Sequence, residues 1–362
     1  MISITLCMIV KNEEKVIERC LRSVKNLVDE IIIVDTGSKD KTKEIVQRYT
    51  NNVYDFKWCD DFSKARNFSF SKATKEYILW LDADDVILKK DREMFISLKK
   101  TLDKNIDIVM MKYNTVYDKN GNPTFSYNRE RLVKNNNKYK WVSPVHEVIV
   151  PTGNILYSNI AISHKSVKKE YSKRNLNIFK KMINNGIKLD ARQQYYYARE
   201  LYYHGMYEDS IKEYRDFLNM DEAWVENKID ACIEISRCFY NINDYKNQIR
   251  FLLKSLEYDA PRANICCEVA NYFIQKEKYD IAIYWYNTAI NLKQDINSGR
   301  FENLECYDYI PYLGLCLCYD KIGNYKMAME YNELVGKIRP DDEKYLYNKA
   351  YFDNLKNNIL QL

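Results

Sequence analysis

The stretch YILWLDADD, Tyr77–Asp85, decides the fold that we predict for this 362-residue chain. Its apolar residues run directly into three carboxylates, so a buried strand would bring Asp82, Asp84 and Asp85 to one edge of a sheet. Carboxylates this close repel one another unless a positive charge lies between them, and oxygen ligands favour Mg²⁺ or Mn²⁺. Two interpretations stay open: a metal site, or an ordinary acidic loop before a helix near Asp91.

The composition predicts a soluble globular protein with room for two domains. Apolar residues make up 46% of the chain and charged residues 30%, and no window approaches the roughly 18 apolar residues of a membrane span. The opening MISITLCMIVKNEE has no basic region before its apolar run, which favours a first strand over a signal peptide. The ten scattered cysteines favour reduced thiols over a disulfide framework. We therefore expect a cytoplasmic protein.

The net positive charge comes from the first half of the chain. Residues 1–166 carry 28 Lys and Arg against 22 Asp and Glu, whereas residues 167–362 carry 28 against 29. This weak, unclustered excess suits a phosphorylated ligand and argues against a nucleic acid partner. The three histidines do not cluster with cysteines in the sequence, which argues against a zinc site.

Strand-like and helix-like segments alternate through the first half. The strands that we predict are 3–10, 30–34, 53–56, the apolar run before Asp82, and 106–113. This alternation predicts a parallel α/β sheet, in which ligands bind at the carboxyl ends of the strands. Lys11, Asn12 and Asp35 follow the first two strands, so we expect them beside a bound nucleotide at the same edge as Asp84. We also predict that Asn12 caps the helix that follows it.

Four motifs of the first half, in this order, resemble the nucleotide-binding half of family 2 glycosyltransferases of the GT-A fold. They are SITLCMIVKNEE, EIIIVDTGSKDKT, DDFSKARNFS and ILWLDADD. The resemblance implies that Asp35 contacts the uracil of a UDP-sugar and that Arg66 supports the base or the diphosphate. It also implies that Asp84, assisted by Asp82 in a DXD motif, holds Mn²⁺ or Mg²⁺ on the diphosphate. A carboxylate can accept the imide N–H of uracil, and arginine offers a planar fork to phosphate.

Further candidates lie in KWVSPVHEVIV, 140–150, and in the later segment AISHKS. A VHE segment after a Trp, with helical repeats beyond it, resembles a subgroup of family 2 that includes bacterial peptide and protein glycosyltransferases such as the bacteriocin S-glycosyltransferases. An inverting transfer needs a carboxylate to take the acceptor proton, and we predict Glu147, with an exposed strand glutamate as the alternative. Strand alternation would send His146 to the opposite face. We predict His164 as a third metal or diphosphate contact, and Lys165 as a charge near the diphosphate or a solvated lysine.

The second half repeats a turn, an aromatic residue and a helix. The aligned aromatic residues, separated by 38, 34 and 46 positions, are Tyr207, Tyr245, Tyr279 and Tyr325. A period near 34 with an aromatic after the turn resembles tetratricopeptide repeats. We therefore predict a GT-A domain at 1–166, a linker helix at 167–190 and an all-α repeat domain at 191–362, with an insertion near 294–305. The repeats would bind the acceptor, form a homodimer, or both.

These patterns and the resemblance to family 2 together imply an inverting, metal-dependent glycosyltransferase. It would move a hexose or N-acetylhexosamine from UDP-glucose or UDP-N-acetylglucosamine to a Ser, Thr or Cys side chain of a peptide or protein. A cell-wall or capsular glycan is the alternative acceptor. A non-catalytic repeat scaffold with a degenerate nucleotide fold is the second alternative, and the clustered charges argue against it. A sugar nucleotidyltransferase is disfavoured because its Gly-rich first turn is absent from the sequence.

Overall fold

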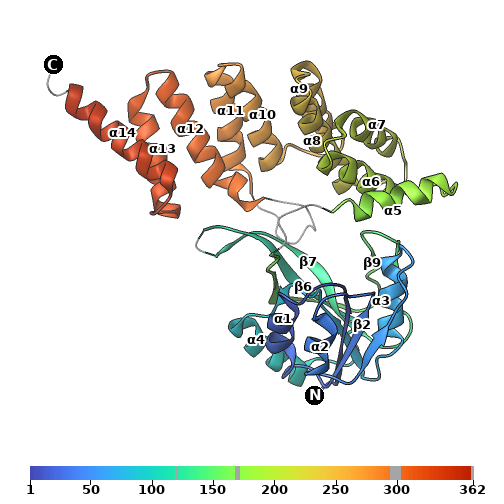
Figure 1. Ribbon diagram of the computed structural model, residues 1–362. Coiled ribbons are helices and arrows are strands. Elements are labelled where there is room, and N and C mark those ends of the chain that lie inside the picture. Colours follow the sequence, from blue (N-terminus) through green and yellow to red (C-terminus); the bar gives the residue numbers. More distant parts are fainter. Residues whose placement is uncertain (120, 168–171, 294–302, 360–362) are drawn as a thin grey trace. The chain divides into compact units, whose positions relative to one another are not determined.

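The computed structural model describes residues 1–119, 121–167, 172–293 and 303–359, and the chain falls into two compact units, Met1–Glu200 and Leu201–Leu362. The first unit is an α/β domain and the second is built from helices (Figure 1). Helices α5 (Arg174–Asn184) and most of α6 (Ala191–Tyr203) fall in the first unit. The domain boundaries that we place after residues 166 and 190 stay a prediction. Most of the predicted insertion at 294–305 lies outside the described residues.

An eight-stranded mixed sheet forms the middle of the first unit. From one edge to the other its strands are β3 (Val53–Asp55), β2 (Glu30–Asp35), β1 (Ile4–Val10), β4 (Tyr77–Trp80), β7 (Pro123–Lys134), β6 (Ile108–Tyr117), β10 (Ile155–His164) and β5 (Asp85–Val86). Four of the neighbouring pairs are parallel, β3–β2, β2–β1, β1–β4 and β6–β10. The predicted fold class, a mostly parallel Rossmann-like sheet of the GT-A type followed by helical repeats, is confirmed.

Strands β7 and β5 run against the others. The reversal at β7 follows from the hairpin that joins it to β6, where Gly121 adopts a positive φ of 83°. Glycine takes this conformation without strain, and a tight turn between strands makes them antiparallel. Strand β6 also runs four residues past the predicted end at 113, because its second half pairs with β7.

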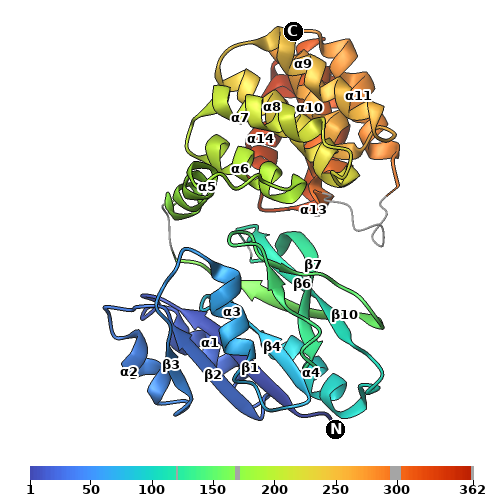
Figure 2. The same ribbon diagram turned by 90° about the vertical axis from the view of Figure 1, so that its right-hand side faces the viewer.

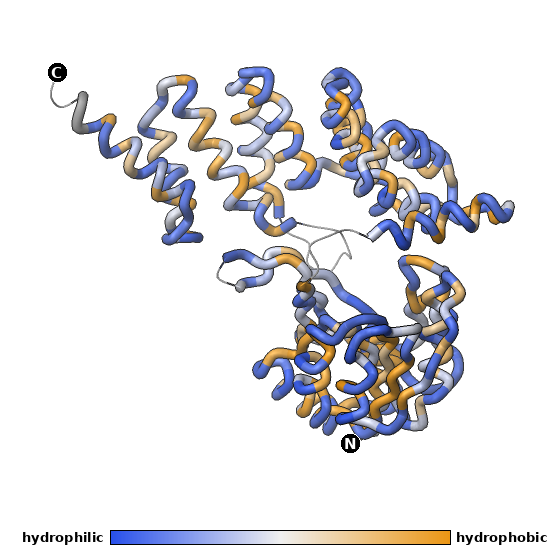
Figure 3. Tube along the Cα trace, viewed as in Figure 1, coloured by the Kyte–Doolittle hydropathy of each residue, from blue (hydrophilic) through white to orange (hydrophobic). Residues whose placement is uncertain are grey.

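Helices cover both faces of the sheet (Figure 2). Helices α1 (Ile17–Val24), α2 (Thr42–Gln47) and α4 (Lys89–Thr101) contribute to one core, and α3 (Phe62–Phe70) contributes to the other. Leu6 and Met8 of β1 enter the first core, while Cys7 between them enters the second, as the two-residue period of a strand requires. The apolar residues are concentrated in these strands (Figure 3).

A small ribbon and a third cluster complete the first unit. Strands β8 (Trp141–Val142) and β9 (Val148–Ile149) form a separate antiparallel pair. Residue Val145, in the loop between them, packs against Phe179 and Met182 of α5. This contact explains why α5 belongs with the sheet domain.

The second unit consists of helices in antiparallel succession. They are α7 (Tyr207–Leu218), α8 (Val225–Asn241), α9 (Tyr245–Lys254), the short η1 (Ser255–Glu257), α10 (Ala263–Gln275), α11 (Tyr279–Asn291), the short η2 (Leu304–Tyr307), α12 (Tyr309–Lys321), α13 (Tyr325–Ile338) and α14 (Glu343–Ile359). The four aligned tyrosines are the first residues of α7, α9, α11 and α13. Two positions before each tyrosine stands a residue with positive φ, in order Gly205, Asn243, Glu277 and Gly323. This shared turn confirms the predicted repeat.

Close packing holds neighbouring helices of the repeats together. A Cβ atom on Gly314 of α12 would come within 2.2 Å of the Tyr286 ring of α11, so only glycine fits there.

All ten cysteines are free, and Cys59 alone among them is exposed. Across the described ranges, no helix is both long enough and apolar enough to cross a bilayer.

Candidate active site

The ends of three strands bring the candidate residues to one edge of the sheet. Asp35 is the last residue of β2, Asp82 and Asp84 follow β4, and His164 is the last residue of β10. Strand β5 pairs with the end of β10 in a register that places Asp85 opposite His164. The acidic turn after β4 is thereby held against a strand from much later in the chain.

Asp84, Asp85 and His164 form one cluster, in which the candidate ligand atoms lie within 4.8 Å of one another. The Nδ1 atom of His164 lies 3.4 Å from Oδ1 of Asp84 and 3.7 Å from Oδ1 of Asp85. The neighbouring carboxylates, Asp84 first and then Asp85, raise the pKa of His164 to about 10, although burial opposes this. The cluster therefore favours a positive charge at this point.

A buried arginine, Arg131, forms an ion pair with one residue of the cluster, Asp85. Arg131 and Asp85 are both fully buried, and Nη1 of Arg131 donates to Oδ2 of Asp85 at 2.9 Å. The guanidinium also lies 3.8 Å from the ring centre of Trp80 and 4.2 Å from that of Tyr113. The other oxygen of Asp85, Oδ1, is buried and accepts no hydrogen bond from any residue of the described ranges. A buried carboxylate oxygen without a donor, beside a second carboxylate and an imidazole, fits a divalent cation.

Asp82 is engaged by Arg66, which also holds Glu147. The Nη2 atom of Arg66 donates to Oδ1 of Asp82 at 2.7 Å, and its Nε donates to Oε1 of Glu147 at 2.6 Å. Burial would raise the pKa of Asp82, but Arg66 and then Arg131 outweigh it and lower this pKa to about 2. Burial likewise opposes the charged form of Arg66, yet Asp82 and Glu147 raise the pKa of Arg66 above its usual value. Asp82 and Arg66 thus remain charged at neutral pH.

His146 and Glu147 have separate partners, but strand alternation is the wrong explanation. Strand β9 begins only at Val148, and His146 has a positive φ of 51°. The ring of His146 stacks on Tyr196 at a centroid distance of 4.0 Å, and its Nε2 lies 2.9 Å from Oε1 of Glu200. The left-handed residue turns the chain, so that the imidazole and the neighbouring carboxylate contact different helices.

Asp35 has one satisfied and one unsatisfied oxygen. Its side chain is almost fully buried, and Oδ1 accepts the backbone N–H groups of Gly37 and Ser38, each at 2.8 Å. Within the part of the chain that the structure describes, Oδ2 accepts no hydrogen bond. Such an atom fits a donor from a ligand, and the imide N–H of uracil is one.

Three residues that we predict near the nucleotide have other neighbours or lie in solvent. Asn12 joins two loops: its Oδ1 accepts the N–H of Lys39 at 2.8 Å, and its own N–H donates to Oγ of Ser38 at 2.9 Å. Helix α1 begins at Ile17, so the prediction that Asn12 caps it is wrong. The ammonium of Lys165 lies 3.3 Å from the ring centre of Tyr117. Lys11 is exposed. A nucleotide contact for these three stays a prediction.

Sequence reasoning placed Asp85 at this edge of the sheet but did not name it among the metal ligands. It assigned no role to four further residues that shape this site, Trp80, Tyr113, Arg131 and Trp141. Asp85 is the third carboxylate of the DADD stretch, but its burial beside His164 depends on the pairing of β5 with β10. A buried arginine in a strand has no signal that distinguishes it from an exposed one.

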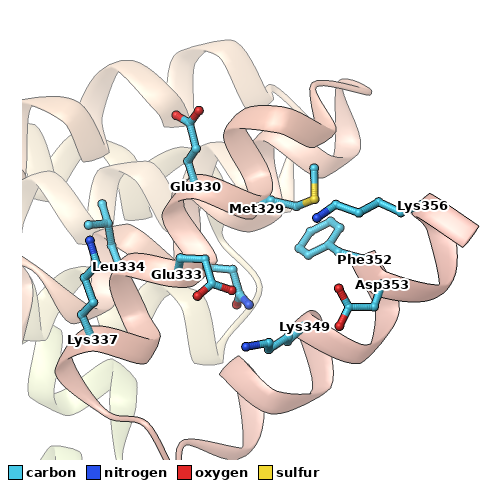
Figure 4. Close-up of a pocket in the computed structure, with 10 residues that line it drawn as sticks. Met329, Glu330, Glu333, Leu334, Lys337, Lys349, Phe352, Asp353 and Lys356 are labelled. Atoms are coloured by element: carbon cyan, nitrogen blue, oxygen red, sulfur yellow. The ribbon is translucent and has the colours of Figure 1, made fainter.

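Described residues of the second unit line at least two hollows. One, of about 470 Å³, lies between α13 and α14 and is lined by charged side chains such as Lys349 and Asp353 around Phe352 (Figure 4). The other, of about 560 Å³, lies along α10, α12 and α14. Whether the repeats bind an acceptor or form a dimer stays a prediction.

Comparison with known proteins gives matches to both halves of the chain. Residues 5–162 match the family model described as Glycosyl transferase family 2. A TPR repeat-containing protein of Synechococcus elongatus is 35% identical over 150 residues, which make up 41% of this chain and 36% of that protein. The SPbeta prophage-derived glycosyltransferase SunS of Bacillus subtilis is 28% identical over 287 residues, covering 75% of this chain and 65% of SunS.

The chain thus spans between about a third and two thirds of the length of these relatives. Among solved structures, residues 1–349 of S. aureus TarS align over 83% of this chain and 97% of that chain, with 15% identity and a TM-score of 0.33. So low a score supports no argument about this chain.

Proposed function

Since residues 5–162 match the model of glycosyltransferase family 2, we propose that the protein moves a hexose or N-acetylhexosamine from a UDP-sugar to a peptide or protein side chain. One observation carries the proposal: Asp84, Asp85 and His164 converge at the carboxyl ends of the strands, with ligand atoms within 4.8 Å of one another. Ligands of open α/β sheets bind at this edge, and a diphosphate is held there through a divalent cation.

Asp84, Asp85 and His164 are the residues that would hold Mn²⁺ or Mg²⁺. The free Oδ1 of Asp85 and the closeness of both carboxylates to Nδ1 of His164 support this choice. When bound, the cation would offset the negative charge that accumulates on the diphosphate as the sugar departs. Asp82 would contribute through its charge and its hydrogen bond with Arg66.

Asp35 is the residue proposed to select uridine. Its buried Oδ2 would accept the imide N–H, while Oδ1 keeps the turn at Gly37 and Ser38 in place. A cytosine ring offers no donor at that position, so the carboxylate would discriminate against it. UDP-glucose and UDP-N-acetylglucosamine are the donors to test first.

Glu147 is the proposed base of an inverting displacement. The acceptor oxygen or sulfur attacks the anomeric carbon, and the bond from that carbon to UDP breaks with its electron pair leaving on UDP. The proton of the acceptor passes to Glu147. The side chain of Glu147 is 11% exposed and lies 2.6 Å from Nε of Arg66, so the carboxylate has a defined position before the acceptor arrives.

The proposed acceptor is a Ser, Thr or Cys side chain of a peptide or protein. The resemblance of the VHE segment to peptide glycosyltransferases supports it, and so does the repeat unit that follows. A glycan acceptor is the competing outcome, which the experiment below has to separate.

Thermal shift tests the donor side. We expect UDP-sugars with Mn²⁺ to raise the melting temperature, and we expect CDP- and GDP-sugars or omission of the metal to give little change. Asp35→Ala should remove the preference for uridine. Stabilisation by no nucleotide sugar under any condition, together with no UDP release, would contradict the proposal and leave a repeat scaffold.

Intact-mass analysis tests the acceptor side. The full chain is incubated with a UDP-sugar, Mn²⁺ and either a peptide library containing Ser, Thr and Cys or cell-wall oligosaccharides. A mass increase of one hexose or N-acetylhexosamine on peptides supports the proposal. Transfer to the oligosaccharides alone would replace the peptide acceptor by a glycan.

A further inference from the structure

Arg66 occupies the centre of the site, between the carboxylate of the DXD motif and the proposed base. We infer that Arg66 is a positioning residue that fixes Asp82 and Glu147 in one ion-paired unit, and that it does not bind the nucleotide. The inference rests on the proposed function, because it takes Glu147 as the base. It departs from the role near the base or diphosphate that the resemblance implies for Arg66.

The edge of Arg66 formed by Nε and Nη2 is already in use. Its Nε and Nη2 atoms donate to Glu147 at 2.6 Å and to Asp82 at 2.7 Å. These are charge-assisted bonds from two different nitrogens of one planar group, and such pairs fix orientation as well as distance. The residue is 8% exposed, which leaves little of it for a ligand to reach.

The guanidinium of Arg66 also lies against the indole rings of two tryptophans. Its central carbon lies 5.1 Å from the ring centre of Trp80 and 4.6 Å from that of Trp141. The two indoles pack edge to face, with centroids 4.8 Å apart. Stacking on aromatic rings holds an arginine in place while leaving its polar edge free to bind carboxylates.

The helix that carries Arg66 is fastened to the loop that carries Glu147. Asn67, the next residue of α3, accepts the N–H of Trp141 and donates to its carbonyl, both at 2.9 Å. At the start of the same helix, the N–H of Phe62 donates to the carbonyl of Pro144 at 2.9 Å. Hydrogen bonds at two points thus join helix α3 to the segment 141–147, and Arg66 connects both to Asp82 after β4.

Charge explains why an arginine is needed at this point. Asp82 and Glu147 would repel each other without a cation between them. A lysine supplies the same charge but lacks the planar fork, so it cannot hold both carboxylates in fixed directions. Loss of Arg66 should therefore displace the proposed base while leaving the uridine site at Asp35 intact.

The test compares Arg66→Lys with Asp35→Ala, which serves as the variant of a nucleotide contact. Calorimetry measures UDP affinity in the presence of Mg²⁺, and steady-state kinetics measures kcat and the KM for the UDP-sugar. For Arg66→Lys we expect a UDP Kd within about threefold of the wild type and a kcat reduced about 100-fold. A UDP Kd weakened as much as in Asp35→Ala would overturn the inference.

A double-mutant cycle tests whether Arg66 acts on kcat through Glu147. A purely structural role of Arg66 would give no such dependence on Glu147. In a Glu147→Gln background, Arg66→Lys should lower kcat by only a few-fold further, since the group that it positions is already disabled. Full additivity of the two reductions in kcat would contradict the inference. If the wild type shows no transfer at all, the proposed function fails, but the UDP affinities still decide whether Arg66 binds nucleotide.

A measurement on the wild-type arginine covers the case in which Arg66→Lys does not fold. In protein labelled with ¹⁵N-arginine, the Nε–H signal that moves on Glu147→Gln identifies Arg66. Addition of UDP and Mg²⁺ should leave that signal nearly unchanged. A shift on UDP binding as large as the shift caused by Glu147→Gln would show a nucleotide contact and sink the inference.

Discussion

Asp85 and His164 lie opposite each other in the register of β5 and β10, and this pairing assembles the proposed cation site. Strand β5 has only two residues, so its place in the sheet depends on the end of β10 and on the ion pair between Asp85 and Arg131. Asp85 and His164 therefore belong to paired strands, and Asp84 lies in the turn directly before β5. Metal binding should therefore depend on the cluster residues, and the stability of the fold should depend on the ion pair between Asp85 and Arg131.

The first prediction concerns the proposed cation site. Asp84→Ala should abolish the stabilisation that Mn²⁺ gives together with UDP, because it removes one of three clustered ligands. Differential scanning fluorimetry measures the shift in melting temperature with and without the metal. Glu93→Gln, an exposed carboxylate on α4, is the control and should keep the full shift. A normal metal-dependent shift in Asp84→Ala would remove Asp84 from the site.

The second prediction concerns the buried pair behind that site. Arg131→Met should lower the free energy of unfolding by about 3 kcal/mol, because it leaves the fully buried Asp85 without its cation. Urea unfolding followed by circular dichroism gives this value. The double variant Arg131→Met with Asp85→Asn should recover part of the loss, since no unpaired charge is then buried. Equal stability of Arg131→Met and wild type would mean that Asp85 carries no charge in the folded chain.

The third prediction is a pH dependence. Glu76 accepts from Nζ of Lys104 at 2.5 Å and from the N–H of Ser3 at 2.8 Å, and these bonds, Lys104 first, lower the pKa of Glu76 to about 2. A carboxyl with a lowered folded pKa stabilises the fold above its unfolded pKa, and this contribution is lost as the pH falls toward the folded value. The wild type should therefore exceed Glu76→Gln in stability at pH 7.

That difference should shrink steadily between about pH 4.5 and pH 2, where the carboxyl takes up its proton. Urea unfolding of both proteins at a series of pH values measures it, with Glu93→Gln as the matched exposed control. A gap that stays constant down to pH 3 would show that Lys104 and Ser3 do not bind the ionised form.

The fourth prediction tests the packing of the repeats. Gly314→Ala would place a methyl group 2.2 Å from the ring of Tyr286, which is itself buried and donates to Oδ1 of Asn271 at 2.6 Å. Overpacking of this kind costs about 1–3 kcal/mol. Thermal unfolding of the full chain should show the loss in the transition of the repeat unit. Combining Gly314→Ala with Tyr286→Leu should recover part of the lost stability. Fully additive losses from the two substitutions would contradict the contact between residue 314 and the Tyr286 ring.

The sequence predicted the main architecture because its signals are local. Apolar runs that end in polar residues gave the strands β1, β2 and β4, and the aromatic after each turn gave the starts of four helices. The direction of β7 was not predicted, since it depends on a hairpin and on pairing with both β4 and β6. Helix propensity also misplaced the start of α1, because Asn12 uses its amide to join two loops.

The candidate site was predicted in its residue types more than in its connections. Asp84, His164, Asp82, Arg66 and Glu147 were all named from the sequence. That Arg66 joins Asp82 to Glu147, residues far apart in the chain, follows from how α3, β4 and the β8–β9 loop pack together. Local sequence patterns do not predict a contact between residues so far apart. The buried ion pair between Asp85 and Arg131 and the pairing of β5 with β10 also depend on tertiary structure.

The two-way hydrogen bonding of Asn67 with Trp141 has a consequence for exchanging the segment that carries the proposed base. A chimera that received the β8–β9 loop of another protein would inherit a backbone shaped for a different helix α3. The exchangeable module is therefore the helix and the loop together, 62–70 with 141–149, transplanted as a pair.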